Sequence, residues 1–330
     1  MLNHLPRYEN KYFNCIQSQI VSYCKHIGFP IEWLFYTSYE RTADLREQFI
    51  EQNKSRWLYE GECLSPEELS LLHIEWHQTQ VESFAEAEPL LMDVLGRGAF
   101  PILTCNLYDL PYKKLHYQKS SVKHRFIYAG REQQGGAATH YVLDDNASAM
   151  GDFIVQPLPD HLLKQTFENS DKRVFWLLFR QPPEEAVIRD QISRRLHDRI
   201  KEFPDDHRFY LEVDSLLDDR EDALFEPGGM IDRLVNAFTL LAGSRYVFSR
   251  FLQYYGGFEV QASRFSDCSL QAEIITNTLV KFKLSRRVNR PSIRDKCIHL
   301  QQAELAAQTS LRQAIFESIE GRELRGSNAV

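Results

Sequence analysis

The spacing of apolar residues changes along the chain, from helical to strand-like and back to helical. In the first part, apolar side chains recur every three or four residues at Ile16, Ile20, Cys24 and Ile27. This spacing places them on one face of a helix, which the glycine and proline that follow would end. A second helix is predicted over residues 77–95, with Pro89 as a point where it could kink.

Short apolar or alternating runs replace this pattern between residues 99 and 180. Each has the length of a β-strand, and turn residues separate them. The runs lie at residues 99–105, 125–130, 139–145, 153–158 and 174–179. Residues 131–136 between the second and third runs end in two glycines and are interpreted as a hairpin loop. The middle of the chain is therefore predicted to form an antiparallel sheet.

Two prolines and two acidic residues at 181–185 mark the predicted boundary between two domains. Helical spacing returns beyond it, at residues 186–203, 230–255, 272–284 and 295–319. The sequence thus predicts an α+β protein with two domains. Residues 1–180 would pack an N-terminal helix on an antiparallel sheet, and residues 181–330 would be mostly α-helical.

Composition and charge narrow the classes of function. The chain has 330 residues, 43% of them hydrophobic and 26% charged, which is typical of a folded globular protein. Its net charge of −7 disfavours a nucleic-acid partner. No apolar run approaches the roughly 18 residues of a membrane span, and the first residues lack the apolar segment of a signal peptide. We therefore expect a cytoplasmic protein that is not embedded in a membrane.

The cysteines indicate single-thiol chemistry rather than a metal or disulfide framework. They are scattered over the chain, at positions 15, 24, 63, 105, 268 and 297. No two of them have the close spacing of a zinc site, so no metal is expected, and in a reducing compartment all six would be free thiols.

Cys15 is the strongest candidate nucleophile. It follows Asn14, a good N-cap residue, and would therefore lie in the first turn of the first helix. The positive end of the helix dipole favours a thiolate there, and free backbone N–H groups can stabilise an oxyanion. Cys24, in mid-helix among apolar neighbours, is better explained as a core residue. Cys105, at the end of a predicted strand, is the weaker rival.

A cysteine nucleophile needs a base, and the base needs an orienting group. His124 opens a predicted strand directly after a polar loop, where its side chain can face a cleft. Asp144 and Asp145 end the following strand, so hairpin pairing could bring either of them to His124. Alternation along that strand favours Asp145. His140, in the middle of the strand, is the main rival base.

The segment over residues 105–146 resembles the N-terminal domain of the butirosin-biosynthesis protein H family of acyltransferases, which are related to papain-like double-glycine peptidases. The resemblance rests on an aromatic-Leu-Pro-Tyr stretch, a histidine that opens a strand ending in Tyr-x-Gly, and a second strand that closes in Asp-Asn. These elements are Tyr108, Leu110, Pro111 and Tyr112, then His124, Tyr128 and Gly130, then Asp145 and Asn146.

The resemblance, over roughly residues 10–170, implies a papain-like catalytic domain with Cys15 as nucleophile. It further implies acyl transfer from a carrier-protein thioester to a small amine, which forms an amide in secondary metabolism. The chain would then need no cofactor of its own, because the phosphopantetheine belongs to the carrier protein. The oxyanion glutamine of the peptidase relatives has no glutamine counterpart here, so Asn10 or Asn14 would serve.

A local excess of basic residues fits this partner. No acidic residue occurs between Asp109 and Glu132, although the protein is acidic overall. Carrier proteins are acidic and present a phosphate, so the basic residues are candidate docking contacts. They are Lys113, Lys114, Lys119, Lys123 and Arg125.

Two other functions remain open on the sequence. The same three side chains could hydrolyse a peptide or amide, because water and an amine compete for one acyl-enzyme. An inert binding protein on this fold is the third alternative. The helical domain could shape the acceptor pocket or mediate a homodimer.

Overall fold

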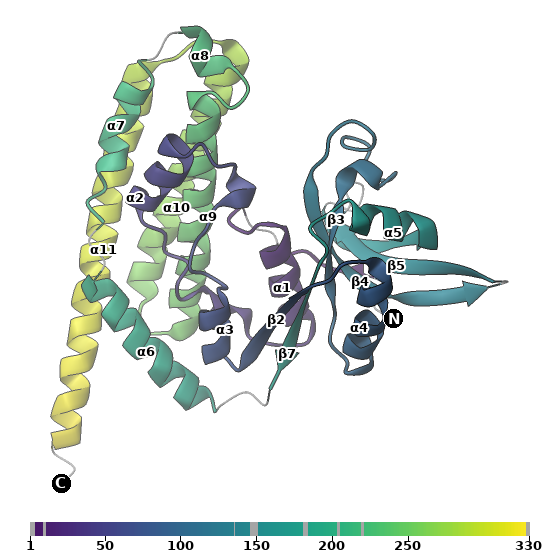
Figure 1. Cartoon of the computed structure of the whole chain (residues 1–330). Coiled ribbons are helices and arrows are strands. Elements are labelled where there is room, and N and C mark those ends of the chain that lie inside the picture. Colours follow the sequence, from purple (N-terminus) through teal and green to yellow (C-terminus); the bar gives the residue numbers. More distant parts are fainter. Residues whose placement is uncertain are drawn as a thin grey trace. The chain divides into compact units, whose positions relative to one another are not determined.

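The computed structural model describes residues 4–8, 11–134, 136–145, 151–180, 184–202, 205–218 and 221–327 (Figure 1). The chain forms two compact units. The first, here the sheet unit, comprises Met1–Glu9, Cys15–Ile31 and Pro66–Pro183. The second, here the helical unit, comprises Asn10–Asn14, Glu32–Ser65 and Glu184–Val330.

A seven-stranded sheet forms the first unit, and every strand pair in it is antiparallel. In spatial order the strands are β1 (His4–Leu5), β6 (Phe153–Pro159), β5 (Ala137–Asp145), β4 (Lys123–Gln134), β3 (Ile102–Asn106), β7 (Arg173–Phe179) and β2 (Ile74–Gln80). Its helices are α1 (Cys15–His26), α3 (Pro66–Leu71), α4 (Phe84–Gly96) and α5 (Asp160–Glu168). The long antiparallel strands place the end of β5 beside the start of β4.

The core of the sheet unit lies between one face of the central strands and helices α4 and α5. Alternate residues of the strands, among them Leu103, Phe126 and Val142, meet Phe84 of α4 and Phe167 of α5 in one buried cluster. Two-residue alternation along each strand explains why every second side chain joins it. The other residues of this cluster include Cys105, Tyr128, Leu158 and Leu163.

Helix α1 packs against β4. The ring of its Tyr23 contacts the rings of Phe100 and Phe179. The helix ends at His26, Gly28 two residues later adopts a left-handed φ of 79°, and the amide of Phe29 donates to the carbonyl of Cys24 at 2.9 Å. Glycine takes this conformation without the steric penalty of a side chain, so the predicted stop at Gly28 is confirmed.

The second unit is built from helices, with the long α9, α10 and α11 as its frame (Figure 1). Helix α9 packs along α10, α10 along α11, and α11 along α7. The helices are α2 (Thr42–Leu45), α6 (Glu185–Glu202), α7 (Arg208–Leu216), α8 (Glu221–Phe225), α9 (Met230–Tyr255), α10 (Glu259–Ser285) and α11 (Arg290–Ser327). None of the described helices combines the length and apolar character that a membrane-spanning segment requires.

The predicted α+β class, the antiparallel sheet and the helical C-terminal region are confirmed. The prediction of one helix over residues 77–95 was wrong at its start, because residues Ile74–Gln80 form β2 and pair with β7. Only the first residues of this edge strand alternate between apolar and polar, and His77–Gln80 are all polar, so the strand pattern is short. The hairpin loop expected at residues 131–136 is shorter, since β4 continues to Gln134.

The two units do not coincide with the predicted division into residues 1–180 and 181–330. Residues 181–183 lie outside the described residues, and the last crossing between the units follows Pro183. Residues 32–65, however, belong to the helical unit. Their aromatic rings pack on α9, with Trp33 against Phe251 and Tyr39 against Phe248. This segment mixes aromatic and charged residues and has no run of proline, glycine or serine, so its composition does not indicate a domain boundary.

Candidate active site

Cys15 is the first residue of α1 and is the one partly exposed cysteine of the six. The first turn of α1 contains no acidic residue that would oppose a thiolate. Cys24, one of its rivals, is buried in the same helix, and burial raises its pKa. Burial also raises the pKa of Cys105, in β3. Only Cys15 combines partial exposure with a position at a helix N-terminus.

His124 lies in β4, directly opposite Cys105 of β3. Its Nε2 atom is 2.7 Å from Oδ1 of Asp144, a carboxylate with no exposed side-chain surface. With Nε2 bound to Asp144, Nδ1 is the nitrogen available to the sulfur of Cys15. This arrangement orients the imidazole as a base between a carboxylate and a thiol.

The pKa values of Cys15 and His124 move in opposite directions. Burial alone would raise the pKa of Cys15, but a hydrogen bond with His124, the charge of His124 and the nearby Arg125 together lower it. Burial alone would lower the pKa of His124, but the charge of Asp144 and the hydrogen bonds with Asp144 and Cys15 raise it to about 10. These shifts favour a thiolate–imidazolium pair.

Asp144 is held by several donors besides His124. The hydroxyl of Tyr112 donates to its Oδ2 at 2.9 Å, the ammonium of Lys113 lies 3.0 Å from Oδ2, and the amide of Asp145 donates to Oδ1 at 2.8 Å. Burial would raise the pKa of Asp144, but His124 and then Lys113 outweigh it and lower the pKa far below its ordinary value. Asp144 is therefore ionised at any physiological pH.

Asp145, which alternation favoured as the orienting residue, lies farther away. Its carboxylate is 3.6 Å from Nε2 of His124, is partly exposed and pairs with Lys113 at 2.7 Å. The strand register explains the difference. Tyr128 pairs with Val142, so His124 and Asp144, each an even number of residues away, share a face of the sheet. The expectation assumed the face of Tyr141 and Leu143, and the structure instead places Asp144 in the hydrogen bond.

Arg125 and Gln19 complete the surroundings of Cys15. The Nη1 atom of Arg125 points toward the sulfur of Cys15 at 3.8 Å. Gln19, one helical turn after Cys15, donates from Nε2 to the backbone carbonyl of Arg125 at 2.6 Å. This hydrogen bond ties the helix of the nucleophile to the strand of the base. Nothing in the sequence pattern distinguished Gln19, one of several polar residues in α1.

The predicted basic docking residues divide into two groups. Lys113 is engaged by Asp144 and Asp145, and Arg125 turns toward Cys15, so neither presents its charge to a partner in the way that was expected. The side chains of Lys114, Lys119 and Lys123 are exposed. Of the two oxyanion candidates, Asn10 lies outside the described residues, and Asn14 immediately precedes Cys15.

The side chains of His124, Asp144 and Asp145 bring their donor atoms within 4.8 Å of one another, which is close enough for a metal ion. The ammonium of Lys113 already lies between the two carboxylates. A cation placed there would meet this positive charge at short range. The donor set therefore fits an ion-pair network better than a metal centre.

His140, the rival base, is fully buried. Its Nδ1 contacts the hydroxyl of Tyr128 at 3.0 Å and its Nε2 contacts Asp160 at 3.2 Å. Asp160 begins α5, a helix that the sequence analysis did not predict. Both ring nitrogens thus have partners, one buried and one partly exposed, which suits a structural role.

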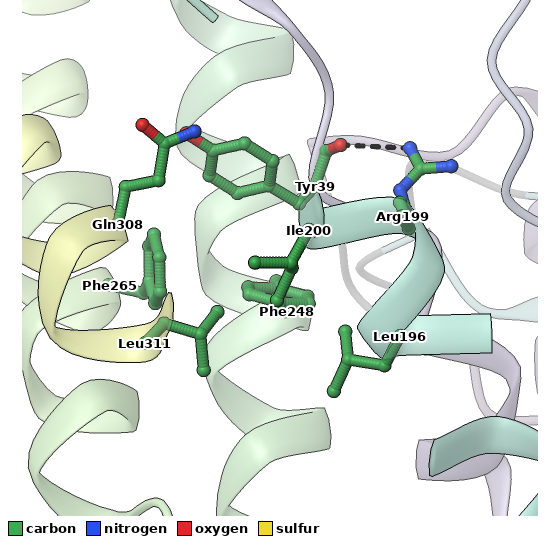
Figure 2. A pocket seen from close by; sticks show the side chains of 8 residues that line it. All are labelled: Tyr39, Leu196, Arg199, Ile200, Phe248, Phe265, Gln308 and Leu311. Carbon is green, nitrogen blue, oxygen red and sulfur yellow. Dashed lines mark hydrogen bonds between the residues drawn. The ribbon is translucent and has the colours of Figure 1, made fainter. Parts of the chain in front are cut away.

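The helical unit contains a small cavity between α6, α9, α10 and α11 (Figure 2). Its volume of about 20 Å³ has room for roughly one water molecule, so it cannot hold an acyl acceptor. The side chains that line it are Tyr39, Leu196, Arg199, Ile200, Phe248, Phe265, Gln308 and Leu311.

Fold and site together define an α+β protein with a cysteine, a histidine and an aspartate gathered where a helix begins beside an antiparallel sheet. No family model matches the chain. The chain is 30% identical over 252 residues to a curated protein of Niallia circulans. That protein is the ribostamycin:4-(gamma-L-glutamylamino)-(S)-2-hydroxybutanoyl-[BtrI acyl-carrier protein] 4-(gamma-L-glutamylamino)-(S)-2-hydroxybutanoate transferase. The match covers 76% of this chain and 79% of the transferase. The chain therefore belongs to the butirosin-biosynthesis protein H family of acyltransferases.

Proposed function

We propose that this protein is a cysteine-dependent acyltransferase that moves an acyl group from a carrier-protein thioester to an amine through an acyl-Cys15 intermediate. The observation that carries the proposal is the pairing of Cys15 with His124, which is itself hydrogen-bonded to Asp144. The Niallia circulans relative is named as a transferase that takes its acyl group from an acyl-carrier protein. A cysteine on a helix and a histidine on an antiparallel strand also support a papain-like catalytic domain.

Acylation begins with the thiolate of Cys15. The sulfur attacks the carbonyl carbon of the carrier thioester, a new carbon–sulfur bond forms, and the carbonyl π electrons move to oxygen. When the tetrahedral intermediate collapses, the bond to the phosphopantetheine sulfur breaks. The imidazolium of His124 can give its proton to that departing thiolate, which leaves neutral imidazole and an acyl-Cys15 thioester.

Deacylation uses the same groups in reverse. The amine attacks the acyl-Cys15 carbonyl, and neutral His124 takes a proton from the amine nitrogen as the amide forms. Collapse expels the thiolate of Cys15 and restores the thiolate–imidazolium pair. Asp144 stays ionised throughout and stabilises the imidazolium each time it forms.

The partner in this proposal is an acidic carrier protein whose phosphopantetheine arm brings the acyl group. Lys114, Lys119 and Lys123 are the exposed residues that we assign to its docking. The chain needs no cofactor of its own for these steps. All six cysteines are free, which suits a reducing compartment such as the cytoplasm.

Intact-mass measurement tests the proposal directly. A carrier protein loaded with the relative's 4-(gamma-L-glutamylamino)-2-hydroxybutanoyl group, and others loaded with simple aliphatic acyl groups, are incubated with the enzyme. We expect an acyl adduct that Cys15→Ala abolishes and that Cys24→Ala, on the same helix, retains. Addition of ribostamycin or simpler amines should release the adduct as an amide.

The other outcomes identify the alternatives. Release only as free acid, with every amine tried, would make the protein a hydrolase with the same three side chains. The absence of an adduct from all donors would contradict acyl transfer and leave a binding protein.

A further inference from the structure

Arg125 lies beside the proposed nucleophile without an acidic partner. Its Nη1 atom is 3.8 Å from the sulfur of Cys15, and the centre of its guanidinium group is 5.3 Å from the ring centre of Phe175. Its Nε atom is buried and makes no hydrogen bond. Among the described residues, no carboxylate lies within ion-pair distance of this guanidinium.

A buried N–H donor without a hydrogen bond is costly, because it has lost its contact with water and gained no acceptor in exchange. Such a group is most easily explained when its partner is present only during the reaction. The reaction proposed above produces an anion at this place, first on the sulfur of Cys15 and then on the carbonyl oxygen of the substrate. Both anions would be satisfied by the N–H groups of a guanidinium.

We propose that Arg125 is a catalytic residue that stabilises the thiolate of Cys15 before attack and the oxyanion of the tetrahedral intermediate after it. This inference rests on the proposed acyl transfer and adds a residue to it. It also supplies a donor for the oxyanion, a role that the family resemblance assigned to Asn10 or Asn14. Together with the backbone N–H groups at the start of α1, Arg125 forms the anion-binding side of the site.

The geometry allows Arg125 to stabilise first the thiolate and then the oxyanion. In a tetrahedral intermediate the oxyanion is bonded to the same carbon as the sulfur, so the two atoms are only about 2.7 Å apart, and an effective donor lies at about 2.7–3.1 Å from the oxyanion. A nitrogen 3.8 Å from the sulfur can therefore reach the oxyanion with a small rotation of its side chain. As negative charge moves from sulfur to oxygen, the guanidinium remains beside it.

Gln19 keeps Arg125 in position. Its Nε2 donates to the carbonyl of Arg125 at 2.6 Å, and Gln19 has no exposed surface. Because Gln19 follows Cys15 by one turn of α1, this bond holds the backbone of Arg125 at a fixed distance from the nucleophile. This bond thus anchors the backbone from which the side chain of Arg125 extends toward Cys15.

Two measurements on Arg125→Met and Arg125→Lys test the inference. The first is the rate at which iodoacetamide alkylates Cys15 as a function of pH, since this neutral reagent reports the thiolate without needing acyl transfer. The second is the single-turnover rate of Cys15 acylation by a small acyl thioester of N-acetylcysteamine, which carries no phosphate and no carrier protein. Arg131→Met is the matched control, because Arg131 lies in the same strand and pairs with Glu88 on the surface.

We expect Arg125→Met to move the alkylation midpoint upward by about one pH unit, as for loss of a nearby opposite charge, and to slow acylation by about 10²–10³-fold. The midpoint and rate of Arg125→Lys should fall between those of Arg125→Met and the native protein. An ammonium keeps the positive charge but lacks the planar set of N–H donors of a guanidinium. Arg131→Met should behave like the native protein. Thermal unfolding of each variant checks that the fold is retained.

Native midpoints and native acylation rates in Arg125→Met would overturn the inference while leaving acyl transfer standing. If the native enzyme formed no acyl adduct at all, the proposed function would fail instead. The alkylation midpoint would then decide the thiolate-stabilising role of Arg125 by itself, supporting it if shifted in Arg125→Met and overturning it if unchanged.

Discussion

Each unit of this protein contains a cluster of buried charges, and the two clusters are built differently. In the helical unit, Arg245 of α9 and Glu304 of α11 are both fully buried. The guanidinium donates from Nε to one carboxylate oxygen of Glu304 at 2.5 Å and from Nη2 to the other at 2.8 Å. Its Nη1 donates to the carbonyl of Glu40 at 2.7 Å, and the group lies 3.8 Å from the ring centre of Tyr39. Every nitrogen of the guanidinium is thus hydrogen-bonded within the unit.

The cluster in the sheet unit leaves part of its bonding capacity open. Arg125 has a buried Nε without a partner, and Cys15 is partly exposed. His124 lies between a thiol that can lose a proton and a carboxylate that stays ionised. A cluster whose donors are all bonded within the protein can hold helices together, whereas a cluster with an unbonded donor can also bind a substrate. The two guanidinium groups therefore differ: every nitrogen of Arg245 is hydrogen-bonded within its own unit, whereas the Nε of Arg125, beside Cys15, has no hydrogen bond and could serve a ligand.

The largest expected effect is on stability, in the helical unit. Glu304→Gln removes the negative charge and leaves Arg245 buried with an incomplete partner. Loss of one member of a buried pair destabilises by about 3–5 kcal/mol, so the urea midpoint of the helical unit should fall markedly. Cys15 alkylation in the folded protein should be unchanged.

Glu317→Gln is the control for this variant, because Glu317 lies on the same helix and is exposed. An unchanged urea midpoint in Glu304→Gln would show that the buried pair contributes little, and the contrast between the two clusters would disappear.

The next largest effect is expected in the sheet unit, on the pH dependence of Cys15. The charge of Asp144 raises the pKa of His124, and protonated His124 lowers the pKa of Cys15. In the native protein the thiolate should therefore form below the ordinary thiol pKa of about 8.5, and the imidazolium should persist up to about pH 10. Asp144→Asn removes the charge, so alkylation by iodoacetamide should move its midpoint to higher pH by about one to three units.

Comparison of Asp144→Asn with Asp145→Asn tests directly which aspartate orients His124. The carboxylate of Asp145 is 3.6 Å from the imidazole and partly exposed, so its removal should shift the midpoint less. A larger shift for Asp145→Asn than for Asp144→Asn would return the orienting role to Asp145.

The sequence could predict those parts of the site that depend on local pattern. Helical spacing and a capping residue located Cys15 at a helix start, and a polar loop before an alternating run located His124 at a strand start. The choice between Asp144 and Asp145 depended on the register of β4 against β5, which no local pattern contains, because a shift of one residue exchanges the two faces.

The remaining features depend on contacts between distant segments. Lys113 counted as one lysine in a basic loop, but Asp144 and Asp145 withdraw it from the surface. Gln19 gains its role only through the carbonyl of Arg125, a residue far along the chain. Residues 32–65 join the helical unit through aromatic packing on α9, and nothing in their composition indicates which unit they belong to. Local propensity cannot report such pairings.

The smallest expected effect concerns the exposed lysines near the site, and it separates docking from chemistry. Reversal of Lys114, Lys119 and Lys123 to Glu should raise KM for an acyl carrier protein several-fold at low salt, because exposed charges steer association. The difference should shrink at high salt as the charges are screened. Acylation by a small uncharged thioester should keep its native rate, since none of the three lysines contacts Cys15, His124 or Asp144 among the described hydrogen bonds and ion pairs.

Reversal of Lys25, Lys201 and Lys281 to Glu changes the net charge equally and serves as the control. If both triple variants raised KM alike, the effect would come from total charge, and this loop would have no special part in docking.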